Sequence, residues 1–308
     1  MVKIRGILHL LLLLLIGGMT FDISAKTGKN VDDPILKIEA SMDDSGFEGE
    51  TMVYEVKLYS TSPDVSNVKI MNAPVFPAGC RVINGVLGNS KPTVEKRDGK
   101  EFYSWVIMRN YLTPYQIGKQ RVSASKFVVF IPRETIVYHS FFGSRSVVEY
   151  DENIVKCEPV EFKIKELPKN KTHKTYNDCV GDFKVEGWFP PGNISVGMDA
   201  YAVFTISGYG SLKSLRITNL SGVFGDGCHL KKVDQDDQLM QRDGRLYSEV
   251  TLTCLFVPDK EDFKIKPFEL TFFNPTTQKY YTVKSEELHW TTTPRNSLEK
   301  RQNEAITI

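Results

Sequence analysis

Cysteine and histidine are the residue types in this 308-residue chain that could support thiol or metal chemistry. Cys228 and His229 are adjacent, and Cys254 and His289 follow at wider spacing. Zinc binds thiolate and imidazole ligands in a tetrahedral arrangement. Adjacent side chains of a strand point to opposite faces, so Cys228 and His229 could bind one ion only if the chain turned or bulged there. The sequence therefore predicts no metal site, and a thiol or metal enzyme stays a third hypothesis.

Other catalytic signatures are absent from the sequence. It contains no Gly-x-Ser-x-Gly motif, no His-Glu-x-x-His motif, no Cys-x-x-Cys pair and no phosphate-binding glycine loop. The acidic clusters at residues 32–33, 43–44, 234–237 and 286–287 lie in turn-like contexts, and we interpret them as solvated turn residues. We therefore expect a protein that is not an enzyme, with no catalytic residue and no cofactor.

The five cysteines allow two interpretations. Disulfides could join Cys80 to Cys157 and Cys228 to Cys254, which leaves Cys179 unpaired between the two pairs. Alternatively, several of them are small buried hydrophobic residues, since free cysteine is among the most buried residue types.

Two groups of aromatic residues could contact a partner. Tyr138, Phe141 and Phe142 lie in a segment without strict alternation, which is typical of a partner-binding loop or of a core strand with a long connection. A second group lies on or near predicted turns and could stack on a glycan, although aromatic rings also dominate sandwich cores. Its members are Trp188, Tyr209, Tyr280 and Tyr281.

The elements that must position these residues are predicted to be β-strands. Short alternating runs rich in β-branched and aromatic residues occur at 52–58, 160–164 and 202–206. Turn residues separate such runs at Asp98-Gly99, Asp243-Gly244 and Gly208-Tyr209-Gly210. Many short strands without interleaved helices favour an all-β fold of sandwiches.

The N-terminus predicts export. Lys3 and Arg5 precede an apolar run over residues 7–16, and small residues follow at Ser24 and Ala25. This order is typical of a secretory signal peptide, residues 1–25, with an uncleaved membrane anchor as the alternative. With 39 Lys and Arg against 38 Asp and Glu, charge gives no argument for a nucleic-acid partner.

Two halves of the chain repeat one another. The segment Phe47-Glu48-Gly49-Glu50 has its counterpart in Ser195-Val196-Gly197-Met198, and each precedes an alternating strand. We expect two tandem immunoglobulin-like β-sandwich domains at residues 33–167 and 178–294. A polar linker, residues 168–177, separates them, and a flexible tail occupies residues 295–308.

The second half resembles the BatD-like family, also called the aerotolerance or oxygen tolerance family. The matching elements are Val196-Gly197, Gly208-Tyr209-Gly210-Ser211-Leu212, Val257-Pro258, residues 262–267, Phe273-Asn274-Pro275 and residues 281–285. Asp262 and Lys266 depart from the Gly and Pro that the family prefers. Family members typically carry a membrane helix after the exported sandwiches, and this chain shows none, so we expect a divergent member.

The resemblance implies a non-enzymatic, periplasmic protein of a bacterial envelope. Such proteins are encoded with von Willebrand A-type Bat proteins and a MoxR-type ATPase, and they are thought to support envelope integrity under oxidative stress. We therefore expect protein–protein interaction in the cell envelope, with membrane association only through a partner or an uncleaved signal segment. An exported glycan-binding β-sandwich protein is the alternative.

Overall fold

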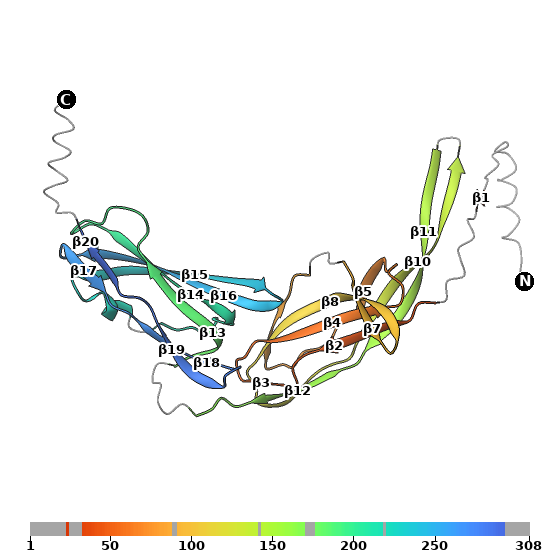
Figure 1. The fold of residues 1–308 in the computed structure, drawn as a ribbon, viewed down its shortest axis with the longest axis horizontal. Helices are drawn as coiled ribbons and strands as arrows, with labels where there is room; N and C mark the ends of the chain where they lie inside the picture. The colour runs from red at the N-terminus through yellow and green to blue at the C-terminus, as the bar shows by residue number, and fades with distance from the viewer. Residues whose placement is uncertain are drawn as a thin grey trace, which may run out of the picture.

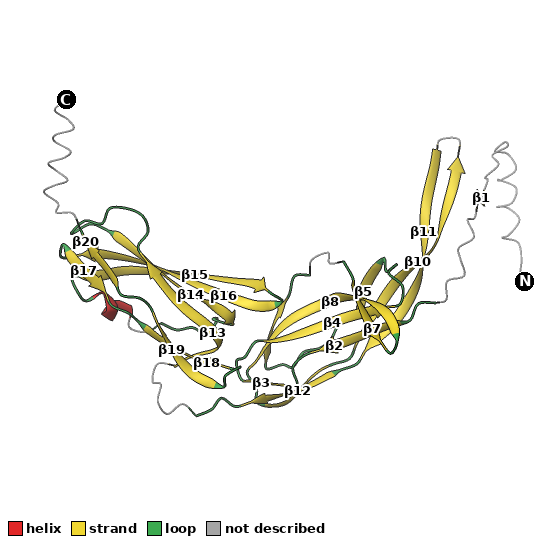
Figure 2. Cartoon of the chain, viewed as in Figure 1, coloured by secondary structure: helices red, strands yellow, loops and turns green. Residues whose placement is uncertain are grey.

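The protein is nearly all β, as the sequence predicts. The computed structural model describes residues 23–24, 33–87, 91–140, 143–169, 176–217 and 220–292. Within these ranges the chain forms strands and one short 3-10 helix, η1 (Leu220–Phe224), and no α-helix (Figure 2). No helix in this part of the chain is long and apolar enough to cross a membrane.

The first half contains three sheets that enclose one buried cluster. The sheets have the orders β2-β4-β8-β6 with β7 on β8, β1-β10-β11 with β5 on β10, and β3-β12-β9. The strands are β1 (Ile23–Ser24), β2 (Leu36–Ser41), β3 (Ser45–Phe47), β4 (Met52–Ser60), β5 (Asn67–Asn72), β6 (Cys80–Asn84), β7 (Thr93–Arg97), β8 (Lys100–Pro114), β9 (Gly118–Val122), β10 (Ser125–Ser140), β11 (Gly143–Cys157) and β12 (Val160–Lys165).

The core of this half follows from the alternation in β4. Its even-numbered residues Tyr54, Val56 and Leu58 are fully buried, because successive side chains of a strand point to opposite faces. They share a cluster with Phe127 and Val129 of β10. The buried faces of two sheets therefore meet, as in a sandwich.

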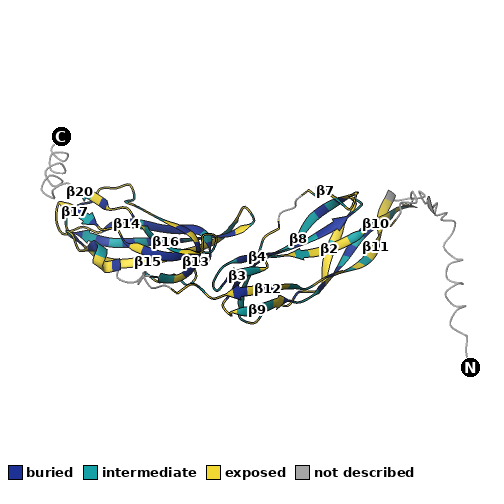
Figure 3. Ribbon diagram, turned by 60° about the horizontal axis from the view of Figure 1, so that its bottom comes forward, coloured by how far each residue is buried: buried dark blue, intermediate teal, exposed yellow. Residues whose placement is uncertain are grey.

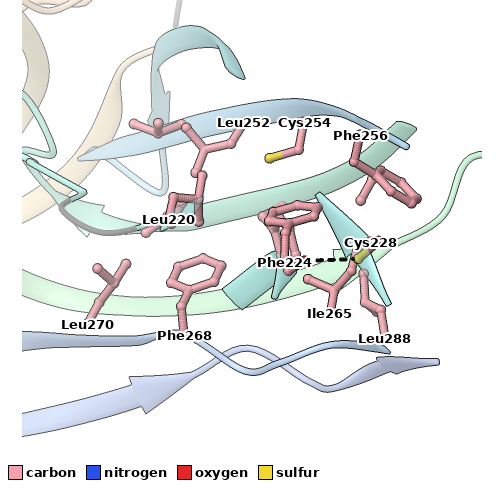
Figure 4. Packing of buried hydrophobic residues seen from close by; sticks show 14 of the residues in the cluster. Leu220, Phe224, Cys228, Leu252, Cys254, Phe256, Ile265, Phe268, Leu270 and Leu288 are labelled. Atoms are coloured by element: carbon pink, nitrogen blue, oxygen red, sulfur yellow. Dashed lines mark hydrogen bonds between the residues drawn. The ribbon is translucent and has the colours of Figure 1, made fainter. Parts of the chain in front are cut away.

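The second half contains a six-stranded sheet of order β15-β16-β14-β13-β18-β19 and a separate β17-β20 pair. Figure 4 shows the phenylalanine-rich core between them, where Phe224, Phe256 and Phe268 pack together with Cys254. The strands are β13 (Tyr176–Trp188), β14 (Ala200–Gly210), β15 (Cys228–Arg242), β16 (Arg245–Pro258), β17 (Asp262–Ile265), β18 (Glu269–Asn274), β19 (Lys279–Lys284) and β20 (Leu288–Thr291).

Strand β13 passes from one partner to another, and glycines make the crossing fit. Its first part pairs with β18 and its second part with β14. A Cβ at Gly208 would lie 2.0 Å from the carbonyl oxygen of Asp182, and a Cβ at Gly210 would lie 2.6 Å from that of Val180. The predicted turn at Gly208-Tyr209-Gly210 is therefore wrong. These residues end β14, and the glycines are needed because two backbones approach closely.

The same backbone hydrogen bonds recur in both halves. In each half, the N–H of one glycine donates to the carbonyl of a proline that ends a long strand. The residue after that proline donates its own N–H to the carbonyl of a second glycine. The pairs are Gly49–Pro114 and Gly79–Tyr115 in the first half, and Gly197–Pro258 and Gly227–Asp259 in the second, all at 2.8–2.9 Å.

The interpretation of the acidic run at 234–237 as turn residues is wrong. It lies in the middle of β15, where each residue pairs with β16, and not in a turn. By contrast, the two Asp-Gly sites do form hairpin turns. Asp98 and Gly99 have φ values of 50° and 76°, and Asp243 and Gly244 have 50° and 72°, as a tight two-residue hairpin connection requires.

The halves lie end to end, and one hairpin projects from the first half (Figure 1). Buried residues run along the middle of each half, and exposed residues cover the outer strands (Figure 3). The only residues of the proposed signal segment that the structure describes are those of β1, and residues 170–175 of the proposed linker fall outside the described ranges.

Candidate interaction surface

The projecting hairpin, which we call the arm, consists of residues 132–140 of β10 and 143–150 of β11. Its ladder runs from Pro132 opposite Tyr150 to Ser140 opposite Gly143. Strand β5 pairs with β10 only as far as Phe130, and no residue of 132–138 or 145–150 is buried. On the other edge of β10, β1 pairs with Val137 and Tyr138. The outer edge of β11 has no strand partner among the described residues.

The arm exposes apolar side chains on both faces. Tyr138 and Tyr150 are each 45% exposed, and Val147 and Val148 are each 37% exposed. Tyr138 is therefore accessible, and the segment around it is neither a core strand nor a long loop. Phe141 and Phe142, the other residues of the predicted contact, lie outside the described residues.

Two like charges face one another on the arm. Glu134 lies directly opposite Glu149 across the two strands, and Arg145 lies opposite Tyr138. Like charges in directly opposite positions destabilise a strand pair. No ion pair to Glu134, Glu149 or Arg145 occurs within the described part of the chain, and Arg145 and Glu149 are exposed.

The other long edge strand, β15, is protected differently. Its outer stretch carries Lys231, Lys232 and the polar run 234–238, all exposed. Charged residues on an edge strand discourage pairing with another chain. Strand β11 also carries exposed charges, Arg145 and Glu149 among them, and the three residues between these two are uncharged.

The four aromatic residues of the glycan hypothesis do not share a platform. Trp188 is exposed and pairs with Val203, whereas Tyr209 pairs with Asp182, six residues earlier on β13 and about 20 Å away. The Tyr209 ring lies under Arg245, and its hydroxyl donates to Asp243 at 2.9 Å.

The two remaining rings have structural contacts. Tyr280 packs against Tyr176 and Phe273, with ring centroids 5.1 Å from each. The hydroxyl of Tyr281 accepts a hydrogen bond from the N–H of Phe183 at 2.6 Å, and burial raises the pKa of Tyr281 to about 12. Both residues fasten the edge hairpin β18–β19 to neighbouring structure.

All five cysteines are free thiols. Cys228 lies opposite Pro258 of β16. Cys254 lies four residues from Pro258 on the same strand, a distance of about 13 Å along β16. A disulfide requires Cα atoms within about 7 Å, so the suggested bond between Cys228 and Cys254 is wrong for this fold. The suggested bond between Cys80 and Cys157 is also not formed: they lie on different sheets, Cys80 opposite Pro114 and Cys157 opposite Ser125.

Burial raises the pKa of these thiols and so disfavours the reactive thiolate. It raises the pKa of Cys228 and Cys80 to about 11, and that of Cys254 and Cys179 to about 12. The neighbouring histidines are engaged on the surface: His229 lies 2.9 Å from Asp259, and His289 contacts Asp262. Within the described ranges, no three Cys, His, Asp or Glu residues are placed to hold a metal ion.

The joint between the halves contains a cleft that the sequence did not indicate. The cleft measures about 390 Å³, and its charged lining residues are Asp43, Glu50, Asp182 and Arg245. Burial raises the pKa of Glu50, whose carboxylate accepts from the N–H of Phe47 at 2.8 Å. Asp43 and Glu50 come from one segment of the first half, and the fold brings Asp182 of the second half to the same cleft.

Contacts on both sides of the cleft hold this joint. Phe47 of the first half packs against Phe273 of the second, with ring centroids 5.0 Å apart. At the other side, the Tyr111 hydroxyl donates to the carbonyl of Gly244, in the turn of the β15–β16 hairpin, at 3.1 Å.

Comparisons with known proteins leave the family open. No protein-family model matches the chain, and no curated protein matches it significantly.

Proposed function

We propose that this chain is a non-enzymatic, exported interaction protein of a bacterial envelope, built from two tandem immunoglobulin-like β-sandwich domains. The recurring glycine–proline hydrogen bonds support a duplicated unit. The resemblance of residues 181–290 supports a divergent BatD-like protein that contributes to aerotolerance. Cleavage after Ala25 would also remove β1 and uncover the edge of β10 at Tyr138.

The observation that carries this proposal is the arm. It extends beyond the core of the first half, exposes apolar side chains and leaves the edge of β11 unpaired among the described residues. An unpaired strand edge can accept a strand from another protein, which supplies backbone hydrogen bonds along its length. The glycan-binding alternative has less support, because the four candidate stacking rings share no surface.

Site-specific photocrosslinking in intact cells tests this proposal. A photoreactive residue at position 148, on the edge of β11, is expected to give one or a few defined adducts with envelope proteins. The same residue at position 236, on the charged edge of β15, serves as the matched control. Adducts that are absent, or identical from both positions, would refute docking at the arm.

Two further measurements address compartment and role. Mass spectrometry of the processed protein is expected to give Lys26 as the first residue. A deletion strain is expected to survive oxygen exposure less well than its parent, and unchanged survival would remove the aerotolerance part of the proposal.

A further inference from the structure

We propose that the arm pairs with the arm of a second copy of this chain, β11 against β11 in antiparallel orientation, centred on Val147. This inference rests on the proposed function of the arm as a docking edge, and it names the partner. The arrangement is a two-fold symmetric, isologous contact, in which the same patch serves both copies.

The charge pattern of the arm argues for self-pairing. In antiparallel pairing centred on Val147, Arg145 lies opposite Glu149 of the second copy, and Glu149 lies opposite that copy's Arg145. Each arginine would then stand beside the like-charged pair Glu134 and Glu149 across the adjoining strands. The second copy therefore places a cation beside Glu134 and Glu149, which form no ion pair within the described part of the chain.

Neighbouring registers fit less well. Centring the contact on Val148 places Val147 opposite Glu149, which sets an apolar side chain against a charge. Centring it on Glu149 places two glutamates opposite one another, and like charges there are destabilising. The register centred on Val148 also pairs Arg145 with Asp151, but of these three registers only the one centred on Val147 sets Arg145 opposite Glu149 and keeps both valines away from charged residues.

The pairing that matches the charges also brings aliphatic side chains together. Ile136 lies opposite Val147 within one arm, so pairing through Val147 makes a continuous row of four aliphatic side chains across the two copies. On the other face, Val148 lies opposite Thr135 and would meet Ser146 of the second copy. Three or more strands are needed for a stable isolated sheet, so the resulting four strands would stabilise an arm that is marginal alone.

Charge reversal tests the pairing in the processed, full-length protein by sedimentation velocity over a concentration series. The wild-type protein is expected to show a reversible monomer–dimer equilibrium that weakens at high salt. Glu149→Arg removes the repulsion with Glu134 inside the arm but sets two arginines opposite each other between copies. We expect it to weaken the dimer about 30-fold, because two cross-strand pairs change sign.

The double variant Arg145→Glu/Glu149→Arg restores opposite charges and is expected to return the dimer. Arg121→Glu, an exposed charge reversal on β9, is the control and should leave the equilibrium unchanged. A wild-type protein that stays monomeric to millimolar concentration, or a dimer indifferent to Glu149→Arg, overturns the proposal.

Disulfide trapping tests the register. A residue on the two-fold axis faces itself at a Cα separation of about 4.5–5.5 Å, which a disulfide can bridge. Val147→Cys is therefore expected to form a covalent dimer under mild oxidation, whereas Val148→Cys, which faces Ser146, should form much less. Preferential trapping at position 148 refutes this register.

The photocrosslinking at position 148 separates the two proposals. Adducts with a second copy support both proposals. Adducts only with a different protein overturn self-pairing and leave the proposed function standing, and no specific adduct overturns both.

Discussion

Replacing Tyr281 by phenylalanine should destabilise the second half by about 2 kcal/mol. The hydroxyl of Tyr281 accepts from the N–H of Phe183 at 2.6 Å and donates to the carbonyl of Gly181 at 3.2 Å. Phenylalanine keeps the ring against Phe272 but leaves the N–H of Phe183 without this acceptor. An unsatisfied buried donor costs about 1–3 kcal/mol, and the loss of a weaker bond adds to it.

Tyr280→Phe is the matched control. Tyr280 is the next residue on β19, and its hydroxyl donates to the carbonyl of Pro168 at an exposed position. Water can replace that bond, so we expect a loss below about 1 kcal/mol.

Urea denaturation measures both variants. The chain has three tryptophans, of which Trp105 lies in the first half. In a Trp105→Phe background, fluorescence reports only on Trp188 and Trp290 in the second half. A loss of 2 kcal/mol corresponds to a midpoint shift of about 1 M urea. If Tyr281→Phe shifts the midpoint no more than Tyr280→Phe, the hydroxyl does not fasten β13 to β19.

Further predictions concern glycine, cysteine and pH. Gly208→Ala should destabilise the second half by about 3 kcal/mol, because its Cβ would meet a carbonyl oxygen 2.0 Å away, whereas Gly225→Ala, with its nearest atom at 3.7 Å, should change the urea midpoint little. At pH 8 a thiol reagent should modify Cys228 and Cys254 slowly in the native protein and all five cysteines in urea; rapid native labelling of these two would contradict their burial. The pKa of Tyr281 is about 12 in the folded state and about 10 in the unfolded state, so the unfolded state releases this proton first and stability should fall as pH rises above about 10. Tyr281→Phe should flatten that fall in a series of urea midpoints, and an equal slope in both proteins would exclude this residue as a cause.

Local turn chemistry was predictable because the residue type determines it. Two consecutive positive φ values in a hairpin favour Asp-Gly, and both Asp-Gly sites adopt them. Gly208 and Gly210 could not be assigned in this way. A glycine that permits close backbone approach has the same sequence signature as a glycine in a turn, and only the crossing of β13 distinguishes them.

Contacts between distant segments were less predictable. The spacing of Cys228 and Cys254 allows a disulfide, but strand register decides it, and β15 places Cys228 opposite Pro258. The acidic run at 234–237 lacks hydrophobic alternation, yet it forms a strand because the ladder to β16 fixes its backbone on an exposed edge. The carboxylates of the cleft at the joint likewise carry no shared local signal.

The length of the arm supports a role outside folding. The corresponding hairpin of the second half consists of β18 and β19, with 6 residues each, whereas β10 and β11 have 16 and 15 residues. Phe127, Val129 and Ile131 of β10 enter the core of the first half, and from Pro132 to Tyr138 no residue is buried. The extra length therefore adds surface and no core. A two-stranded ribbon that buries little gains stability only from what it contacts, which is why the partly exposed Ile136 and the exposed Val147 beside it point to a partner.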